Sequence, residues 1–461
     1  MRLAWLLALL VLNMLDPWPT EARADWLVFG RGGQVELPAQ IQGPNVLVTT
    51  PDGSRSFPLR AFRSIVAAQR VEDDWHERRT RADRDCSVEA RFAAAWWALE
   101  QGLTPEAIHS FRSALAAPGA AEHAALVRVG RLLDQLDAPV ADAELGRLQS
   151  LIGGLGWAEL RGRHMTLWHQ GSTADATERL DVLDRVVMTF YVSLAAQGVE
   201  LAVPRRRLVS VWFAQQTDYA EFLRRIGAAP FADTHGYYHP THAAVFAFDS
   251  RTGADQIRPR QAIERQSRNS TLAKDDCVDL DRQSLLLDLR WRSVDLGIAA
   301  HETIHQLVAA SGLAPRFDDF PNWLHEGFAA QFEVVRGGRW AGFGRVNDFR
   351  IADWRSIATT PAIPPLLRDN GLIHGYHRDR YAESWALVYF LRKTRPDEFV
   401  TFLNLLRTPR SPNQPNESGA AFVAAFGADL AAIGTEWRAF LNERATPLET
   451  HSRRATVVKS F

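Results

Sequence analysis

Two histidines and a glutamate lie within one short stretch, His301-Glu302-Thr303-Ile304-His305. On an α-helix, residues four apart lie on the same face, so both imidazoles can point at one ion about 2.0–2.1 Å away. Glu302 is rotated from the histidines, yet its carboxylate reaches the water that such an ion binds and can take a proton from it. The stretch therefore predicts a helix that binds zinc through His301 and His305, with Glu302 as a general base.

A glutamate farther along the chain can supply a third ligand. A catalytic zinc ion takes three protein ligands and leaves one position open, and 20 residues separate His305 from Glu326. On a second helix behind a short loop, the Glu326 carboxylate can face both imidazoles. The alternatives are a coincidental surface helix for the first motif and an exposed helix carboxylate for Glu326. The presence of both motifs favours the metal site.

The residues around Glu326 indicate how that second helix begins. Asn322 or the Asp318-Asp319 pair is expected to open it, with Pro321 near its first turn. His325 precedes Glu326 and could be mistaken for a ligand. Because neighbouring helix residues project about 100° apart, we expect His325 to face away from the ion.

The two motifs together resemble a known family. A His-Glu-x-x-His motif, a gap of about twenty residues and the box Trp323-Leu324-His325-Glu326-Gly327-Phe328-Ala329 are similar to gluzincin metallopeptidases, in particular the bacterial peptidase-MA-like group of largely unknown function. The box also resembles aminopeptidase N-type enzymes. The resemblance covers roughly residues 155–445 and implies an α+β metallopeptidase domain with a small mixed sheet and a mainly helical C-terminal lobe. It implies one Zn²⁺ per chain, with Glu302 as the base and the ligands His301, His305 and Glu326.

The chain departs from the family pattern in two places. No Gly-x-Met-Glu-Asn box lies upstream of the motif, which argues against aminopeptidase activity. Thermolysin-like enzymes carry an aspartate four residues after the third ligand, where it orients a histidine, and here that position is Ala330. Glu333 is a candidate for that task, and a plain surface position on the helix is the equal alternative.

A tyrosine is a candidate for stabilising the oxyanion of the tetrahedral intermediate, since zinc alone does not hold all of its charge. Tyr381 opens an expected helix 55 residues after Glu326, a position similar to the tyrosine of aminopeptidase-type gluzincins. Tyr376 and His377 are rivals for the role. Packing in the core is the alternative for Tyr381.

Strands and helices must position these residues within the metallopeptidase domain, residues 155–445. Strands are expected at His164–His169, Leu208–Phe213, Gly236–Tyr238 and Ala243–Phe248. Helices are expected at Ala174–Gln197, Tyr219–Ile226, Arg380–Arg392, Glu398–Arg407 and Ala420–Asn442. The polar segment 250–285 is expected to be a long surface loop. The run Ala243–Phe248 is a candidate edge strand for a peptide substrate, or else simple core.

The residues before this domain divide into two parts. Residues 25–61 alternate in hydrophobicity and contain the turn Pro51-Asp52-Gly53, which predicts a small β-module of two to four strands. Residues 62–154 have a helical pattern, with a hairpin that resembles one tetratricopeptide-like unit. A single unit makes no binding array, so a scaffold role is expected. Residues 446–461 are expected to be a flexible tail.

The N-terminus has the features of a secretory signal peptide. Arg2 precedes the apolar run Leu3–Leu15, and the pattern Ala22-Arg23-Ala24 predicts cleavage after residue 24. An uncleaved membrane anchor is the alternative, although the run is shorter than the ~20 residues that span a bilayer. An exported chain, periplasmic or secreted, is therefore expected to have no membrane span after signal removal. Cys86 and Cys277 would then pair or remain free thiols.

The composition narrows the choice of partners. The 461 residues carry a formal net charge of −1, with 46% hydrophobic and 23% charged residues, so no field favours nucleic acid or anionic lipid. The leading hypothesis is a zinc peptidase that acts on a peptide or protein substrate, with the oligomeric state left open. The alternatives are a catalytically silent peptidase fold that binds or assembles partners, and a zinc hydrolase that acts on cell-wall peptides.

Overall fold

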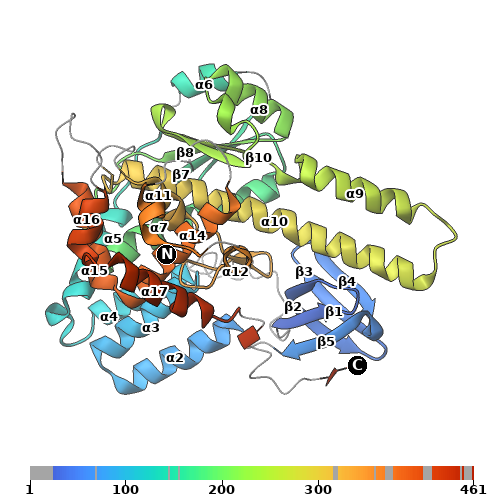
Figure 1. The fold of residues 1–461 in the computed structure, drawn as a ribbon, viewed down its shortest axis with the longest axis horizontal. Coiled ribbons are helices and arrows are strands. Elements are labelled where there is room, and N and C mark those ends of the chain that lie inside the picture. The colour runs from blue at the N-terminus through green and yellow to red at the C-terminus, as the bar shows by residue number, and fades with distance from the viewer. Residues whose placement is uncertain are drawn as a thin grey trace, which may run out of the picture. The chain divides into compact units, whose positions relative to one another are not determined.

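The structure is a computed structural model (Figure 1). It describes residues 24–460 apart from 68–69, 144–145, 154–155, 315–319, 358–359, 369–376, 409–417, 447–448 and 451–458. Residues 1–23 of the signal peptide expected at 1–24, the Asp318-Asp319 pair and Tyr376 therefore lie outside the described residues. The chain is of mixed α+β class and forms two compact units, and it passes from one unit to the other after Asp74, Arg265, Leu286 and Thr446.

The first unit comprises residues 1–74, 266–286 and 447–461. Its antiparallel sheet has the strand order β13-β5-β1-β2-β3-β4. The strands are β1 (Ala24–Phe29), β2 (Gln34–Gln42), β3 (Asn45–Thr50), β4 (Gly53–Pro58), β5 (Phe62–Ala67) and β13 (Lys459–Ser460). The Pro51-Asp52-Gly53 turn is confirmed, because β3 and β4 pair across it.

The β-module is larger than the sequence predicts. Phe62–Ala67 was expected to start the helical region, but it forms strand β5 and pairs with β1. The ring of Phe62 lies 4.7 Å from that of Phe29 and 6.0 Å from that of Phe57, which closes a small aromatic core. Pairing with a strand more than thirty residues away stabilises β5, and local periodicity does not reveal such a partner.

The second unit comprises residues 75–265 and 287–446. Its sheet has the order β6-β7-β8-β10-β9, in which β7, β8 and β10 are parallel and the two outer strands antiparallel. The strands are β6 (Ala158–Arg161), β7 (Met165–His169), β8 (Leu208–Phe213), β9 (Gly236–His239) and β10 (Ala244–Phe248). A separate two-stranded ladder joins β11 (Val335–Arg336) and β12 (Arg339–Trp340).

Helices supply most of the chain. The first group is α2 (Val71–Asp85), α3 (Val88–Glu100), α4 (Thr104–Leu115), α5 (Ala124–Asp137), α6 (Gly146–Ile152), α7 (Thr173–Gln197), α8 (Gln216–Arg225) and α9 (Ala254–Ser267). The second group is α10 (Lys274–Ala310), α11 (Asn322–Ala329), α12 (Asp348–Ser356), α13 (Ile363–Arg368), α14 (Arg378–Thr394), α15 (Pro396–Arg407), α16 (Ser418–Phe426) and α17 (Leu430–Asn442). The expected helices in 155–445 are thus largely confirmed.

Helices cover both faces of the five-stranded sheet (Figure 1). Side chains alternate along a strand, so Val211 and Phe246 pack with α8 on one face. Trp212 and Ala247 pack on the other face, with the core that includes α7 and the second half of α10. Burial on both faces explains why β10 is a continuous apolar run.

Two expectations about residues 155–445 were wrong, and the sheet order decides a third that had two alternatives. Residues 250–285 are not a loop but contain α9 and the start of α10, both rich in charged residues. Ala420–Asn442 is not one helix, because the chain bends by 76° between α16 and α17, where Gly427 has a φ of +96°. For the run at Ala243–Phe248 the alternative of simple core is confirmed and the edge strand is not, because Ala244–Phe248 lies between β8 and β9 and is buried throughout.

The helical region and the metallopeptidase region are not separate units. α3 and α4 form the expected hairpin, but a Cβ on Gly102 between them would lie 2.6 Å from the backbone nitrogen of Gly342. This close backbone approach joins the hairpin to the C-terminal half, so the boundary expected at residue 154 does not divide the fold.

The described part of the chain contains no single helix that is long and apolar enough to cross a membrane, although the bent pair of α16 and α17 together reaches that length and composition. Cys86 and Cys277 are both exposed and are free thiols.

Candidate metal centre

Helix α10 carries the His-Glu-x-x-His motif and is fixed to the sheet by a side chain next to it. Gln306 is buried, and its amide donates hydrogen bonds to the backbone oxygens of Val209 (3.1 Å) and Ala243 (2.9 Å). These bonds join α10 to β8 and to the start of β10. Residues 301–305 are therefore held at a fixed distance from the sheet.

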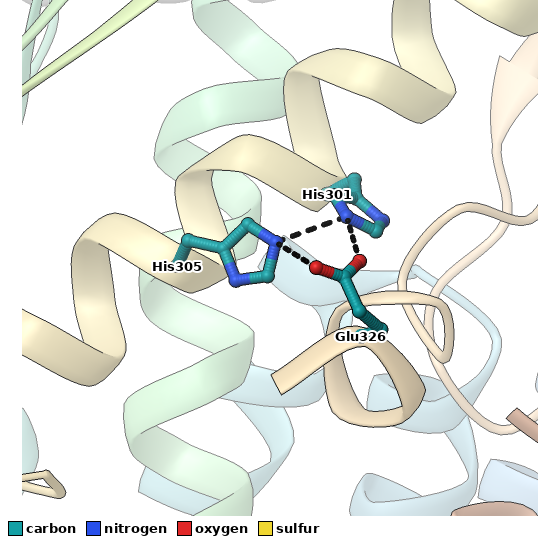
Figure 2. Close-up of side chains that lie close together, drawn as sticks. All are labelled: His301, His305 and Glu326. Atoms are coloured by element: carbon teal, nitrogen blue, oxygen red, sulfur yellow. Dashed lines mark hydrogen bonds and ion pairs between the residues drawn. The ribbon is translucent and has the colours of Figure 1, made fainter. Parts of the chain in front are cut away.

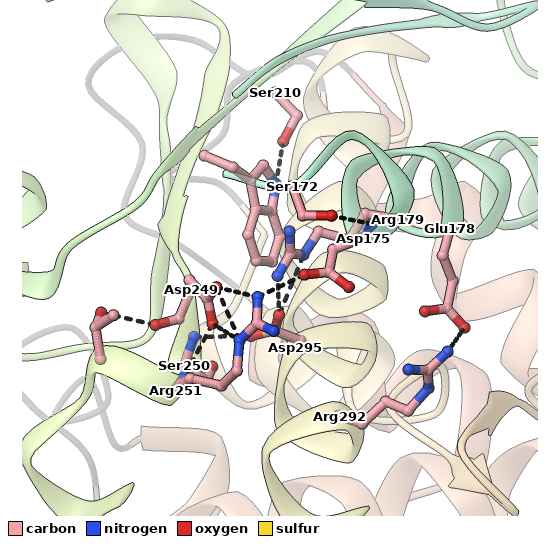
Figure 3. A network of polar contacts seen from close by, with 12 residues as sticks. Ser172, Asp175, Glu178, Arg179, Ser210, Asp249, Ser250, Arg251, Arg292 and Asp295 are labelled. Carbon is pink, nitrogen blue, oxygen red and sulfur yellow. Dashed lines mark hydrogen bonds and ion pairs between the residues drawn. The ribbon is translucent and has the colours of Figure 1, made fainter. Parts of the chain in front are cut away.

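A buried ionic network fixes α10 at Asp295, six residues before His301 (Figure 3). Asp295 accepts from the guanidinium of Arg179 on α7 and from the backbone N–H of Ser250, the latter at 3.0 Å. Arg179 also lies 4.5 Å from the ring centroid of Trp212 on β8. Because Asp295 and Arg179 are each almost fully buried, the network orients α7, α10 and the sheet with respect to one another.

Three side chains converge from two helices (Figure 2). The Nε2 atoms of His301 and His305 are 3.0 Å apart. Glu326 on α11 places Oε2 3.2 Å from Nε2 of His301 and Oε1 3.7 Å from Nε2 of His305. A tetrahedral ion with bonds of about 2.0–2.1 Å needs ligand atoms about 3.3 Å apart. The separations among the two Nε2 atoms and the two Glu326 oxygens are therefore close to those that a tetrahedral metal ion with three protein ligands needs.

The protonation of this cluster shows that it attracts positive charge. Burial alone would lower the pKa of His301, but hydrogen bonds to Glu326 and Glu333 raise it to about 10. Burial lowers the pKa of His305 to about 3. Burial also opposes ionisation of Glu326, yet the His305 and His301 side chains lower its pKa to about 2. A proton on His301 thus lies between two carboxylates, and a divalent cation can replace that charge.

Glu302 lies against the edge strand of the sheet. Its Oε2 accepts a hydrogen bond of 2.8 Å from the backbone N–H of Tyr238 on β9. A Cβ on Gly236 would lie 2.9 Å from Cγ of Glu302 and 2.6 Å from Ile298, so only glycine lets β9 approach α10 this closely. Burial raises the pKa of Glu302 to about 7, a value suited to a group that takes up a proton near neutral pH.

Glu333 orients the first histidine. It follows α11 in an irregular segment, and its Oε1 lies 2.7 Å from Nδ1 of His301, which donates to it. Glu333 is mostly buried, so the alternative of a plain helix surface residue is wrong. Such a carboxylate fixes the tautomer and orientation of a histidine that binds metal. The Arg350 side chain holds the pKa of Glu333 at about 2 despite burial.

The remaining candidates fall at different distances from the cluster. The ring of Tyr381 on α14 lies 6.5 Å from the ring of His301, whereas His377 is exposed at the start of that helix. His325 is not part of the cluster of His301, His305 and Glu326, as expected. It is nevertheless buried, and its ring lies 5.6 Å from that of His305. Asn322 begins α11 as one of the expected alternatives, with Pro321 before it.

Four residues that contact the site were not predicted from the sequence. Gly236 and Tyr238 contact Glu302 from β9, and Asn347 and Arg350 contact Glu333 from α12. Asn347 precedes an acidic first helical turn and accepts hydrogen bonds there, so a capping signal was present. No local pattern connects any of the four to the histidine motif.

The comparison with known proteins extends over the centre of this site. No curated protein matches the chain. Residues 295–412, which include the three converging side chains, Glu302, Glu333, Arg350 and Tyr381, match the model of the family described as "Protein of unknown function (DUF1570)".

Proposed function

We propose that the chain is an exported zinc-dependent peptidase of the gluzincin type, with one Zn²⁺ bound by His301, His305 and Glu326. The observation that carries this proposal is the convergence of three side chains: the two Nε2 atoms are 3.0 Å apart, Oε2 of Glu326 lies 3.2 Å from Nε2 of His301, and Oε1 lies 3.7 Å from Nε2 of His305. Three such ligands would leave one position of a tetrahedral ion open. The donor set of two imidazoles and one carboxylate is typical of catalytic zinc. Export is supported by the sequence of the first 24 residues alone.

Bound zinc would supply a Lewis acid that lowers the pKa of a water molecule and polarises the carbonyl of the bond to be cleaved. The chain's own residues do the rest. Glu302 takes a proton from the attacking water and passes it to the leaving amine. Tyr381, whose ring lies 6.5 Å from that of His301, donates a hydrogen bond from its hydroxyl to the developing oxyanion in this proposal.

The position of the base supports a peptide as substrate. Glu302 is hydrogen-bonded to the backbone of β9, and β9 is the last strand in the sheet order. An extended peptide can add to such an edge through main-chain hydrogen bonds, which would place its backbone beside Glu302. A peptide substrate is thus expected to pair with β9 (Gly236–His239) and not with β10 (Ala244–Phe248).

The test combines metal content with cleavage. The purified protein should hold about one zinc ion per chain by elemental analysis. Glu302→Gln should retain the zinc and lose about 10²–10⁴-fold in the cleavage of an unfolded protein or a peptide library. Glu221→Gln, an exposed glutamate on α8, is the matched control and should behave as the unchanged protein.

Each other outcome decides against part of the proposal. Absence of bound zinc after incubation with zinc salts would refute the metal site. Full activity in Glu302→Gln would refute its role as base. Zinc binding without cleavage of any peptide would favour the silent binding protein, and cleavage restricted to wall-derived peptides would favour a cell-wall hydrolase.

A further inference from the structure

The first turn of α12 presents two side chains to Glu333. Asn347 precedes the helix, and its Oδ1 accepts from the backbone N–H groups of Phe349 (3.1 Å) and Arg350 (3.2 Å). Its Nδ2 donates to Oε2 of Glu333 at 3.1 Å. Arg350 donates to the same carboxylate twice, from Nε to Oε2 at 2.9 Å and from Nη2 to Oε1 at 2.7 Å.

This arrangement fixes the plane of the carboxylate. A bidentate guanidinium pair restricts both oxygens, and the amide of Asn347 adds a third donor on one of them. Asn347 and Arg350 are 3% and 9% exposed, so water competes little for these bonds. Oε1 of Glu333 is left in one position, from which it accepts the hydrogen bond of His301.

Arg350 also contacts the candidate oxyanion donor. Its Cζ lies 5.1 Å from the ring centroid of Tyr381, within the range of a cation–π contact. The same ring lies 6.5 Å from that of His301, tilted by 33°. One guanidinium therefore contacts both the carboxylate that orients His301 and the tyrosine beside it.

We propose that Asn347 and Arg350 are positioning residues of the metal centre, which hold Glu333 so that His301 presents Nε2 to the ion, and that Arg350 also places Tyr381. This inference rests on the metal site of the proposed function, but not on the reaction. If Arg350 acts through its charge alone, the Arg350→Lys variant should bind zinc as tightly as the unchanged protein. If Arg350 acts through its planar guanidinium, Arg350→Lys should weaken zinc binding. An ammonium group can neither bind both Glu333 oxygens in a fixed plane nor stack on the Tyr381 ring.

Zinc affinity, measured by competition with a chromophoric chelator, tests the proposal without reference to activity. Arg350→Lys and Asn347→Ser should each weaken zinc binding about ten- to hundredfold, as loss of an outer partner of a metal ligand does. Serine keeps the capping acceptor at position 347, so this variant remains informative if Arg350→Lys folds poorly. Combining Arg350→Lys with Glu333→Gln should weaken binding no more than Glu333→Gln alone, because both act through one carboxylate.

The matched control is Arg336→Lys. Arg336 is also a buried arginine that bonds to α12, through Asp348 at 3.2 Å, and none of its described hydrogen bonds or ion pairs goes to Glu333. Its replacement should leave zinc affinity unchanged even if the melting temperature falls. With Co²⁺ in place of zinc, the visible absorption bands should change shape in Arg350→Lys and Asn347→Ser, and not in the control.

The outcomes separate this inference from the proposed function. No metal binding by the unchanged protein would refute the proposed function and this inference together. Metal binding by the unchanged protein, with the same affinity and cobalt spectrum in Arg350→Lys and Asn347→Ser, would overturn the inference alone. Multiplicative losses in the Arg350→Lys and Glu333→Gln combination would also overturn it, because the two residues would then act independently.

Discussion

The contact between α11 and α14 allows a sharp prediction at a residue that has no chemistry of its own. Gly327 follows the proposed ligand Glu326, and a Cβ there would lie 2.3 Å from the backbone oxygen of Ser384 and 2.8 Å from a methyl group of Val388. Real Cβ atoms essentially never come closer than 3.0 Å. In Gly327→Ala the two helices must therefore separate by about 0.7 Å, since backbone cannot turn aside as a side chain can.

Two energies oppose each other in this variant. Alanine in a helix interior is favoured over glycine by about 1 kcal/mol, whereas overpacking of a tight contact costs about 1–3 kcal/mol. Zinc–ligand distances in protein sites lie within about 0.2 Å of their usual values, so a shift of α11 also disturbs the position of Glu326. We expect a lower melting temperature and zinc affinity reduced about tenfold, which corresponds to about 1.4 kcal/mol.

The control and the assay use the same substitution elsewhere. Gly434 lies inside α17, where a Cβ would meet only the end of the Arg438 side chain at 3.4 Å. Gly434→Ala should be as stable as the unchanged protein or up to about 1 kcal/mol more stable, with the same zinc affinity. Thermal melting with and without zinc, plus chelator competition, measures both quantities. A Gly327→Ala variant that melts and binds zinc as Gly434→Ala does would refute the reasoning.

Three further predictions concern other parts of the fold. Asp295→Ala leaves the buried Arg179 guanidinium without its carboxylate and should cost about 3–5 kcal/mol in urea denaturation; a loss below about 1 kcal/mol would contradict the role of this network. Burial, with the Arg163 and Arg207 charges, lowers the pKa of His164 from 6.5 to about 4. Neutral His164 therefore costs the folded state nothing above pH 6.5, and the free energy of unfolding falls as the pH drops below 6.5, because the unfolded chain then binds a proton that the folded chain does not. Between pH 7.5 and pH 5 the free energy of unfolding should fall by about 2 kcal/mol more in the unchanged protein than in His164→Gln, and equal losses would contradict the shift. Because Cys86 and Cys277 are exposed thiols, both should react with a maleimide in the native state, and mass spectrometry that finds neither modified would indicate a disulfide or burial.

Most residues of the candidate site could be predicted from the strongest local motifs in the sequence. Residue spacing alone placed His301 and His305 on one helical face, and the box around Glu326 pointed to a second helix. The structure brings these atoms together. Most strands and helices of residues 155–445 were also predictable, because each has a clear period or a capping signal. The charged segment 250–285 gave no such period, and its helices were missed.

Only the tertiary structure decided which residues from distant parts of the sequence contact one another. The edge strand is β9 and not β10, because sheet order depends on which strands pair and not on how apolar each is. Glu333 looked equally suited to the surface until Asn347 and Arg350, on another helix, were seen to hold it. The sequence by itself determined which side chains can bind an ion, since spacing along one helix is local. The partners that orient them come from distant segments, and only packing brings those segments together.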